Sequence, residues 1–168
     1  MRRRFPPALP SISTTNSAKR CHVTVKFRSL DKQDKTQWLS LWKGYNDFYG
    51  SELADEVTEY TWTRLLDPAS SMFCRVAVLD GTVVGFVHCV LHEGTWVTSQ
   101  MCYLEDLFVD PAWRGKGVAR QLIQFVLNEA KEQGWSRFYW HTRIHNPARK
   151  LYDEFVAADD FVRYCVSL

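Results

Sequence analysis

Hydrophobic residues recur along this chain with two periods, and these periods predict its strands and helices. Alternating or continuous apolar runs rich in β-branched residues predict strands at 23–27, 72–79, 82–91, 101–109, 137–142 and 161–166. Apolar residues spaced three or four apart predict helices at 38–49, 56–66, 118–133 and 146–155. The resulting order, β-α-α-β-β-β-α-β-α-β, predicts an α/β fold with a mixed central sheet and flanking helices.

Turn residues separate these elements. Asp80-Gly81 lies between two apolar runs and predicts a hairpin. The second of these runs is apolar on both faces, which is typical of a central strand. Gly50 and Gly134 each follow the last periodic residue of a helix, as a helix-ending glycine does.

The stretch from Tyr103 to Ile123 carries the strongest chemical signal. It predicts a buried strand, a glycine-rich loop and the start of an amphipathic helix, a combination that forms an anion site from backbone N–H groups and the helix dipole. A Walker loop is excluded because Lys116 is followed by Gly117. A dinucleotide fingerprint is excluded because Arg120 stands at the position of the third glycine.

The remaining pattern, Arg114-x-x-Gly117-x-Ala119, resembles the acetyl-CoA pyrophosphate loop of the GNAT superfamily of N-acetyltransferases. The resemblance spans residues 23–166 and is strongest over 101–123 and 137–152. The stretch Trp38–Tyr49, together with Leu66-Asp-Pro68, is also similar to the fungal-type histone, polyamine and D-amino-acid acetyltransferases of that superfamily. The resemblance implies a GNAT fold and transfer of acetyl from acetyl-CoA directly to a primary amine in a ternary complex.

This resemblance assigns the cofactor-binding residues. The glycines of the loop let the backbone approach the pyrophosphate closely, and the basic side chains add positive charge. Leu107 and Val109 are expected to offer backbone hydrogen bonds to the pantetheine arm, and Asn146 to contact the same arm. The predicted acetyl-CoA residues are Leu107, Val109, Arg114, Gly115, Lys116, Gly117, Val118, Ala119 and Asn146.

Amine acetylation also requires proton transfers. Deprotonating a lysine-like amine at pH 7 costs about 4.6 kcal/mol, so a nearby carboxylate suits the task. By resemblance Glu105 is the general-base candidate, with Glu93 as the alternative, and strand alternation predicts that Glu105 and Asp106 face opposite sides of the sheet. Tyr152, six residues after Asn146, is the candidate general acid for the departing thiolate. A structural salt-bridged Glu105 and a buried core Tyr152 are the alternatives.

The sequence says less about the acceptor than about acetyl-CoA. The aromatic stripe of 38–49, with Asp47, Glu52 and Glu56, predicts a pocket for a cationic amine. A small amine, a polyamine or an amino acid is favoured over a histone lysine, because one compact domain offers little surface for a long peptide. A non-catalytic acyl-CoA-binding sensor or scaffold of the same fold is the alternative function.

Composition and charge narrow the function classes. The 168 residues hold 46% hydrophobic side chains, which predicts one soluble domain over 23–168, and no apolar run is long enough for a membrane span. Residues 1–30 carry seven Lys and Arg and no acid, whereas the other 138 residues carry 14 basic and 19 acidic groups. An acidic body argues against nucleic-acid binding. Segment 1–22 is expected to be disordered or to be a transit-like presequence.

Cysteines and histidines predict no further chemistry. The five cysteines show no Cys-x-x-Cys pair and are expected to be buried free thiols, with Cys102 and Cys165 packing in the interior. Among His88, His92, His141 and His145, the last two have a metal-ligand spacing only if they lie on a helix. They fall at the end of a predicted strand, so no metal is predicted. The expected location is cytoplasmic, with mitochondrion or plastid as alternatives. Pairing through the last strand would give a homodimer.

Overall fold

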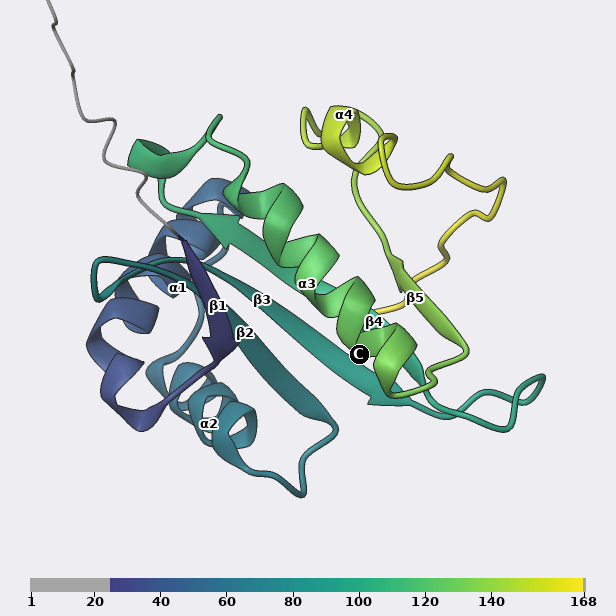
Figure 1. The fold of residues 1–168 in the computed structure, drawn as a ribbon, viewed down its shortest axis with the longest axis horizontal. Coiled ribbons are helices and arrows are strands. Elements are labelled where there is room, and N and C mark those ends of the chain that lie inside the picture. Colours follow the sequence, from purple (N-terminus) through teal and green to yellow (C-terminus); the bar gives the residue numbers. More distant parts are fainter. Residues whose placement is uncertain (1–24, 168) are drawn as a thin grey trace, which may run out of the picture.

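A five-stranded sheet with helices on both faces forms the core of the computed structural model, which describes residues 25–167 (Figure 1). In chain order its elements are β1 (Lys26–Ser29), η1 (Lys32–Asp34), α1 (Lys35–Tyr49), α2 (Asp55–Leu66), β2 (Met72–Leu79), β3 (Thr82–His92), β4 (Met101–Val109), η2 (Pro111–Trp113), α3 (Val118–Glu132), β5 (Arg137–Trp140) and α4 (Arg149–Tyr152). The α/β fold with a mixed sheet is therefore confirmed. The predicted segment 1–22 lies outside the described residues.

The strands are ordered β1-β2-β3-β4-β5 across the sheet. The first four pair antiparallel, and β4 and β5 pair in parallel. The parallel ladder joins Met101–Leu104 to Arg137–Trp140 and then ends. In the part of the chain that the structure describes, residues 105–109 of β4 therefore have no strand partner on their β5 side, and the sheet opens there.

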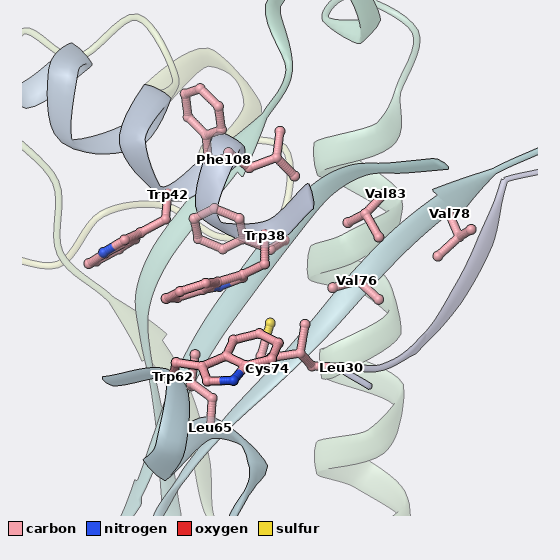
Figure 2. Packing of buried hydrophobic residues seen from close by; sticks show 12 residues of the cluster. Leu30, Trp38, Trp42, Trp62, Leu65, Cys74, Val76, Val78, Val83 and Phe108 are labelled. Carbon is pink, nitrogen blue, oxygen red and sulfur yellow. The ribbon is translucent and has the colours of Figure 1, made fainter. Parts of the chain in front are cut away.

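Each face of the sheet carries its own hydrophobic cluster. Helices α1 and α2 cover one face, where Trp38 packs between Trp42 and Trp62 (Figure 2). Trp42 also contacts Phe86 of β3. Helix α3 covers the other face with the inner stripe predicted from its sequence, which is buried against the sheet. The two clusters hold β3 and β4 as a rigid centre, and the opening between β4 and β5 lies at its edge.

A β-bulge in β4 changes which side chains share a face. His88 of β3 pairs with Asp106, but the next residue, Cys89, pairs with Leu104, so Glu105 is an extra residue in the ladder. Leu104 packs in the α3 cluster, while Asp106 contacts His88 on the α1 face. Because the bulge breaks strand alternation, Glu105 and Asp106 lie on the same side. The prediction that they face opposite sides is wrong.

The predicted last strand at 161–166 does not form. Segment 153–167 leaves α4 without joining the sheet, and its apolar side chains are exposed, Phe161 and Tyr164 among them. Asp159 accepts a hydrogen bond from the Phe161 amide, a local turn that competes with strand pairing. Cys165 is also exposed, so its predicted packing is wrong, whereas Cys102 is buried as predicted. The homodimer stays a prediction, now without the strand on which it rested.

Other boundaries differ by a few residues. The helix predicted at 146–155 contains only Arg149–Tyr152 as α-helix, flanked by turns, and β5 ends at Trp140 instead of 142. The Asp80-Gly81 hairpin is present, with both residues at positive φ, as its two-residue turn requires. No helix among residues 25–167 is both long and apolar enough to cross a membrane.

Candidate active site

The loop between β4 and α3 is shaped as an anion cradle. Asp110 accepts a hydrogen bond from the Ala112 amide and caps η2. Gly115 and Gly117 then adopt the left-handed backbone, with φ of 72° and 81°, and Gly117 is the N-cap of α3. The first amides of α3 have no acceptor within the helix and carry its positive dipole end. The loop therefore has the left-handed glycines and the free helix N-terminus that the predicted anion site requires, and its anion binding stays a prediction.

A pocket of about 360 Å³ lies between this loop and the α4 region. The loop side is formed by residues of 113–120, including the predicted Arg114, Gly115, Gly117, Val118 and Ala119. The opposite side is formed by Pro147, Lys150, Leu151 and Glu154. Val109, the last residue of β4, also lines the pocket, which therefore adjoins the part of β4 that has no β5 partner.

The basic side chains of the loop have distinct contacts. Arg114 donates through Nε to the Val109 carbonyl at 2.9 Å and lies over the Phe108 ring. Lys116 donates to the Ala112 carbonyl at 3.1 Å and lies over the Trp113 ring. These two residues brace the loop while their remaining N–H groups stay exposed.

Arg120 and Glu154 form an ion pair across the mouth of the pocket. Backbone amides, two left-handed glycines and nearby cations make a donor set that fits a diphosphate group. The pocket thus suits the pyrophosphate of the acetyl-CoA predicted from the sequence.

Asn146 has both ends of its amide engaged within its own loop. Its Nδ2 donates to Thr142 Oγ1 at 2.8 Å, and its Oδ1 accepts from the Ala148 amide at 2.9 Å. These bonds fix the turn that precedes α4 and therefore the position of Tyr152. Leu107 is half-buried on β4, beyond the last β4–β5 pair, as a contact to the pantetheine arm requires.

Glu105 lies at the opening beside Asp106 on the α1 face. Its side chain reaches the surface, yet partial burial raises the pKa of Glu105, the negative charge of Asp106 raises it further, and Arg163 of the C-terminal segment opposes the rise. A carboxylate with a raised pKa is a stronger base toward an ammonium group. The bulge thus places the predicted base beside a second carboxylate that the sequence pattern did not assign to the site.

Asp106 is held by a buried histidine. Its Oδ2 lies 3.0 Å from Nδ1 of His88, and Trp38 donates through Nε1 to Nε2 of the same ring at 2.9 Å. His88 and Trp38 are fully buried. Tyr45 faces Asp106 from α1, and burial together with that carboxylate holds the pKa of the Tyr45 phenol far above its usual value. Sequence reasoning missed this group because its hydrogen-bonded members are far apart in sequence, 50 positions between Trp38 and His88 and 18 between His88 and Asp106.

Tyr152 lies at the other side of the opening. Its ring packs against Trp140 with 5.5 Å between centroids. Burial, and then Tyr49, raise the pKa of Tyr152 to about 12. The Tyr49 ring contacts Tyr45 at 5.0 Å between centroids, and the Arg143 guanidinium lies over it at 5.5 Å. Tyr45 and Tyr49 of α1 therefore connect the predicted acid to the carboxylate pair.

Other predicted groups lie elsewhere. Glu93 is exposed in the loop after β3. Asp47 is exposed and paired with Lys43 on α1, and Glu52 and Glu56 are exposed before and within α2. The carboxylates at the opening are instead Glu105 and Asp106. Among residues 25–167, no three His, Cys, Asp or Glu side chains gather as a metal site would require.

Known proteins are similar to this chain in both sequence and fold. Residues 37–155 match the profile of the Acetyltransferase (GNAT) family. The D-amino-acid N-acetyltransferase HPA3 of Saccharomyces cerevisiae is 31% identical over 156 residues, which cover 91% of this chain and 97% of that protein.

Solved structures agree with this match. A ribosomal-protein-alanine N-acetyltransferase from Brucella melitensis biovar Abortus 2308 superposes with a TM-score of 0.69 at 26% identity, covering 86% of this chain and 100% of the other. The aminoglycoside N-acetyltransferase AAC(6')-Iy in complex with CoA shares the fold, with a TM-score of 0.70 at 21% identity, over 87% and 95% of the two chains.

Proposed function

Because this chain belongs to the GNAT acetyltransferase family, we propose that it transfers acetyl from acetyl-CoA to the amino group of a small primary amine, with free amino acids as the favoured class. The observation that carries the proposal is the pair Glu105 and Asp106 at the sheet opening, next to the diphosphate-binding loop. The fungal relative, a D-amino-acid N-acetyltransferase by name, supports an amino-acid acceptor.

Acetyl-CoA supplies the thioester carbonyl that the amine attacks. The loop amides around Gly115 and Gly117, with Arg120, would hold its pyrophosphate. The unpaired edge of β4 at residues 105–109 offers backbone groups to the pantetheine arm. These contacts would bring the thioester to the opening between β4 and β5.

Glu105 would take the proton from the acceptor ammonium, directly or through one water. At pH 7, forming the neutral form of a lysine-like amine costs about 4.6 kcal/mol. Because the pKa of Glu105 is raised, the difference between its pKa and that of the ammonium is smaller, and proton transfer between them is easier. Asp106 adds negative charge at the same point, and the tyrosine rings of α1 give a cationic group aromatic neighbours. The neutral amine then attacks the carbonyl carbon.

Tyr152 would donate a hydrogen bond to the departing sulfur. With a pKa of about 12 it stays protonated at neutral pH. Full proton transfer to a thiolate of ordinary pKa, near 8.5, is uphill by about 5 kcal/mol. Its main contribution is therefore a fixed O–H donor aimed at the developing negative charge.

Arg143 is the candidate partner for an acceptor carboxylate. Its guanidinium lies over the Tyr49 ring at 5.5 Å, and Tyr49 contacts Tyr45. The positive charge of Arg143 beside these two rings would attract the carboxylate of an amino acid toward the site. This arrangement favours an amino acid over a polyamine, which has no anionic group.

The first experiment measures CoA release from acetyl-CoA with D- and L-amino acids, spermidine, lysine and a histone-tail peptide. We expect turnover with amino acids and a loss of about 100-fold in kcat/KM for Glu105→Gln. Arg143→Gln should raise KM for amino acids but not for spermidine, and Glu93→Gln, exposed after β3, is the control without effect. Tight acetyl-CoA binding without turnover on any acceptor would favour the sensor alternative.

A further inference from the structure

His88 is a fully buried titratable residue with both ring nitrogens engaged. Trp38 donates its indole N–H to Nε2 at 2.9 Å, so this nitrogen must offer its lone pair. Nδ1, 3.0 Å from the Asp106 carboxylate, must then carry the ring proton and donate it. An indole N–H can only donate, so these two contacts permit the neutral Nδ1–H form alone.

We propose that Trp38 and His88 are positioning residues: His88 donates to Asp106 and holds it as the charged member of the carboxylate pair, and Trp38 keeps His88 neutral so that this charge is not compensated. Glu105 is then the member of the pair that exchanges a proton with the acceptor. This inference rests on the proposed function. Trp38 acts through His88, and His88 acts through Asp106. Neither of them touches the substrate.

The argument begins with the carboxylate pair. Two neighbouring carboxylates repel each other when both are charged, so one of them tends to bind a proton. Hydrogen bonds donated to one member stabilise its charged form. Asp106 receives the Nδ1–H of His88 and is faced by the Tyr45 hydroxyl, whereas Glu105 receives no side-chain hydrogen bond among the described residues. The proton therefore goes to Glu105.

Trp38 keeps His88 neutral and thereby preserves this distribution of charge. Without its N–H, the Nε2 of His88 would be free to bind a proton, and the resulting imidazolium would neutralise Asp106. The electric field of Asp106 at Glu105 would then weaken. Because Trp38 lies between α1 and the sheet, helix packing itself fixes the charge state of the site.

Other titratable groups face Glu105 and Asp106 from the elements that pack around them. From β2, the buried Cys74 thiol has its pKa raised by burial and stays neutral. From β4 and β5, Tyr103 and Tyr139 have raised pKa values, chiefly through burial, and also stay neutral. Arg163 of the C-terminal segment is the one cation whose charge reaches Glu105 among the described residues.

The test follows His88 directly by nitrogen NMR. In the wild-type protein we expect the Nδ1–H tautomer at pH 7, with a proton on Nδ1 and none on Nε2. Trp38→Phe removes the donor to Nε2 and should let that nitrogen bind a proton. Trp62→Phe, which removes a neighbouring buried indole that packs on Trp38 but gives His88 no hydrogen bond, is the matched control and should leave His88 neutral.

A second variant covers the case in which Trp38→Phe does not fold. Asp106→Asn keeps the shape of the half-buried side chain and removes its charge. We expect the carboxyl carbon of Glu105 to titrate at a lower pH in this variant than in the wild type. The acidic limb of the kcat/KM profile should move in the same direction.

Two results would overturn the inference. One is a wild-type His88 that carries a proton on Nε2 at pH 7, or whose Nε2 resonance is the same in Trp38→Phe as in Trp62→Phe. The other is an unchanged Glu105 titration in Asp106→Asn. Neither measurement needs turnover, so an inactive protein with the expected titrations would refute the proposed function and leave the assigned charge states standing.

Discussion

Asp34 is a single buried carboxylate that joins the first strand to the first helix. It accepts two hydrogen bonds from the Arg28 guanidinium, at 2.6 and 2.8 Å, and one from the Asp31 amide at 2.8 Å. Burial alone raises the pKa of the Asp34 carboxyl, but these donors outweigh burial and hold it below the usual value. A lowered pKa stabilises the folded state above the unfolded pKa of about 3.9, and this stability is lost as pH falls through the folded pKa.

We therefore expect Asp34→Asn to lower the free energy of unfolding by about 1–2 kcal/mol at pH 7, a value kept small because the Arg28 side chain is partly exposed. The difference from the wild type should shrink as the pH falls below 4. Urea unfolding at several pH values measures it. Asp47→Asn, in an exposed pair with Lys43, is the control. Equal losses in both variants would contradict the argument.

The sequence alone was enough to identify those site residues whose role depends on the residues next to them in the chain. Gly117 could be placed in the anion loop because a left-handed turn at a helix start calls for glycine. Glu105 and Tyr152 followed from a family pattern, and their catalytic roles stay predictions. His88 and Arg163 could not be found in this way, because their contacts to the site cross the sheet or return from the chain end.

Elements with strong local signals were predicted almost to the residue. The Asp80-Gly81 hairpin and helix α3 are examples, since a two-residue turn and a long amphipathic stripe are each sufficient on their own. The bulge at Glu105 and the absence of a strand at 161–166 escaped prediction. Both depend on how a strand pairs with its neighbour, which the apolar pattern of one strand does not encode.

Close packing between β3 and β4 sets the position of the bulged strand. A Cβ added at Gly85 would lie 2.9 Å from the Phe108 carbonyl oxygen, a backbone atom that cannot move alone. We expect Gly85→Ala to lower the free energy of unfolding by about 1–3 kcal/mol through overpacking. Thermal or urea unfolding measures this loss.

Gly44→Ala on α1 provides the contrast. Its Cβ would meet only the end of the Phe108 ring at 3.0 Å, and a helix interior favours alanine over glycine by about 1 kcal/mol. We expect little net change in stability. A Gly44→Ala variant as damaged as Gly85→Ala would show that the ring, and not the strand backbone, is the rigid part of this contact.

At the scale of the whole molecule, the C-terminal segment returns to the centre of the sheet. In Figure 1 this tail passes behind β5 toward β4, and the charge of Arg163 acts on Tyr103 and Glu105. The last described residues thus influence a site formed mainly by α1 and β4. No local sequence pattern links these positions, so this charge effect could be recognised only in the structure.

Removing this charge should change the pH dependence of the enzyme. Arg163 lowers the pKa of Glu105, so Arg163→Gln should raise that pKa and move the acidic limb of the kcat/KM profile to higher pH. Lys131→Gln loses the same charge from α3, on the opposite face of the sheet, and should leave the limb in place. Identical profiles for Arg163→Gln and the wild type would place the tail away from Glu105 in solution.

The exposed thiol of Cys165 lies two residues beyond Arg163, while Cys74, Cys89 and Cys102 are sealed in the interior. A maleimide dye would therefore attach to the tail in preference to these three, and a Cys21→Ser background would remove the remaining thiol of the sequence. Fluorescence from that position would measure whether acceptor binding changes the surroundings of the tail. The exposed C-terminal segment, which does not form the strand predicted at 161–166, thus offers an attachment point for a fluorescent reporter.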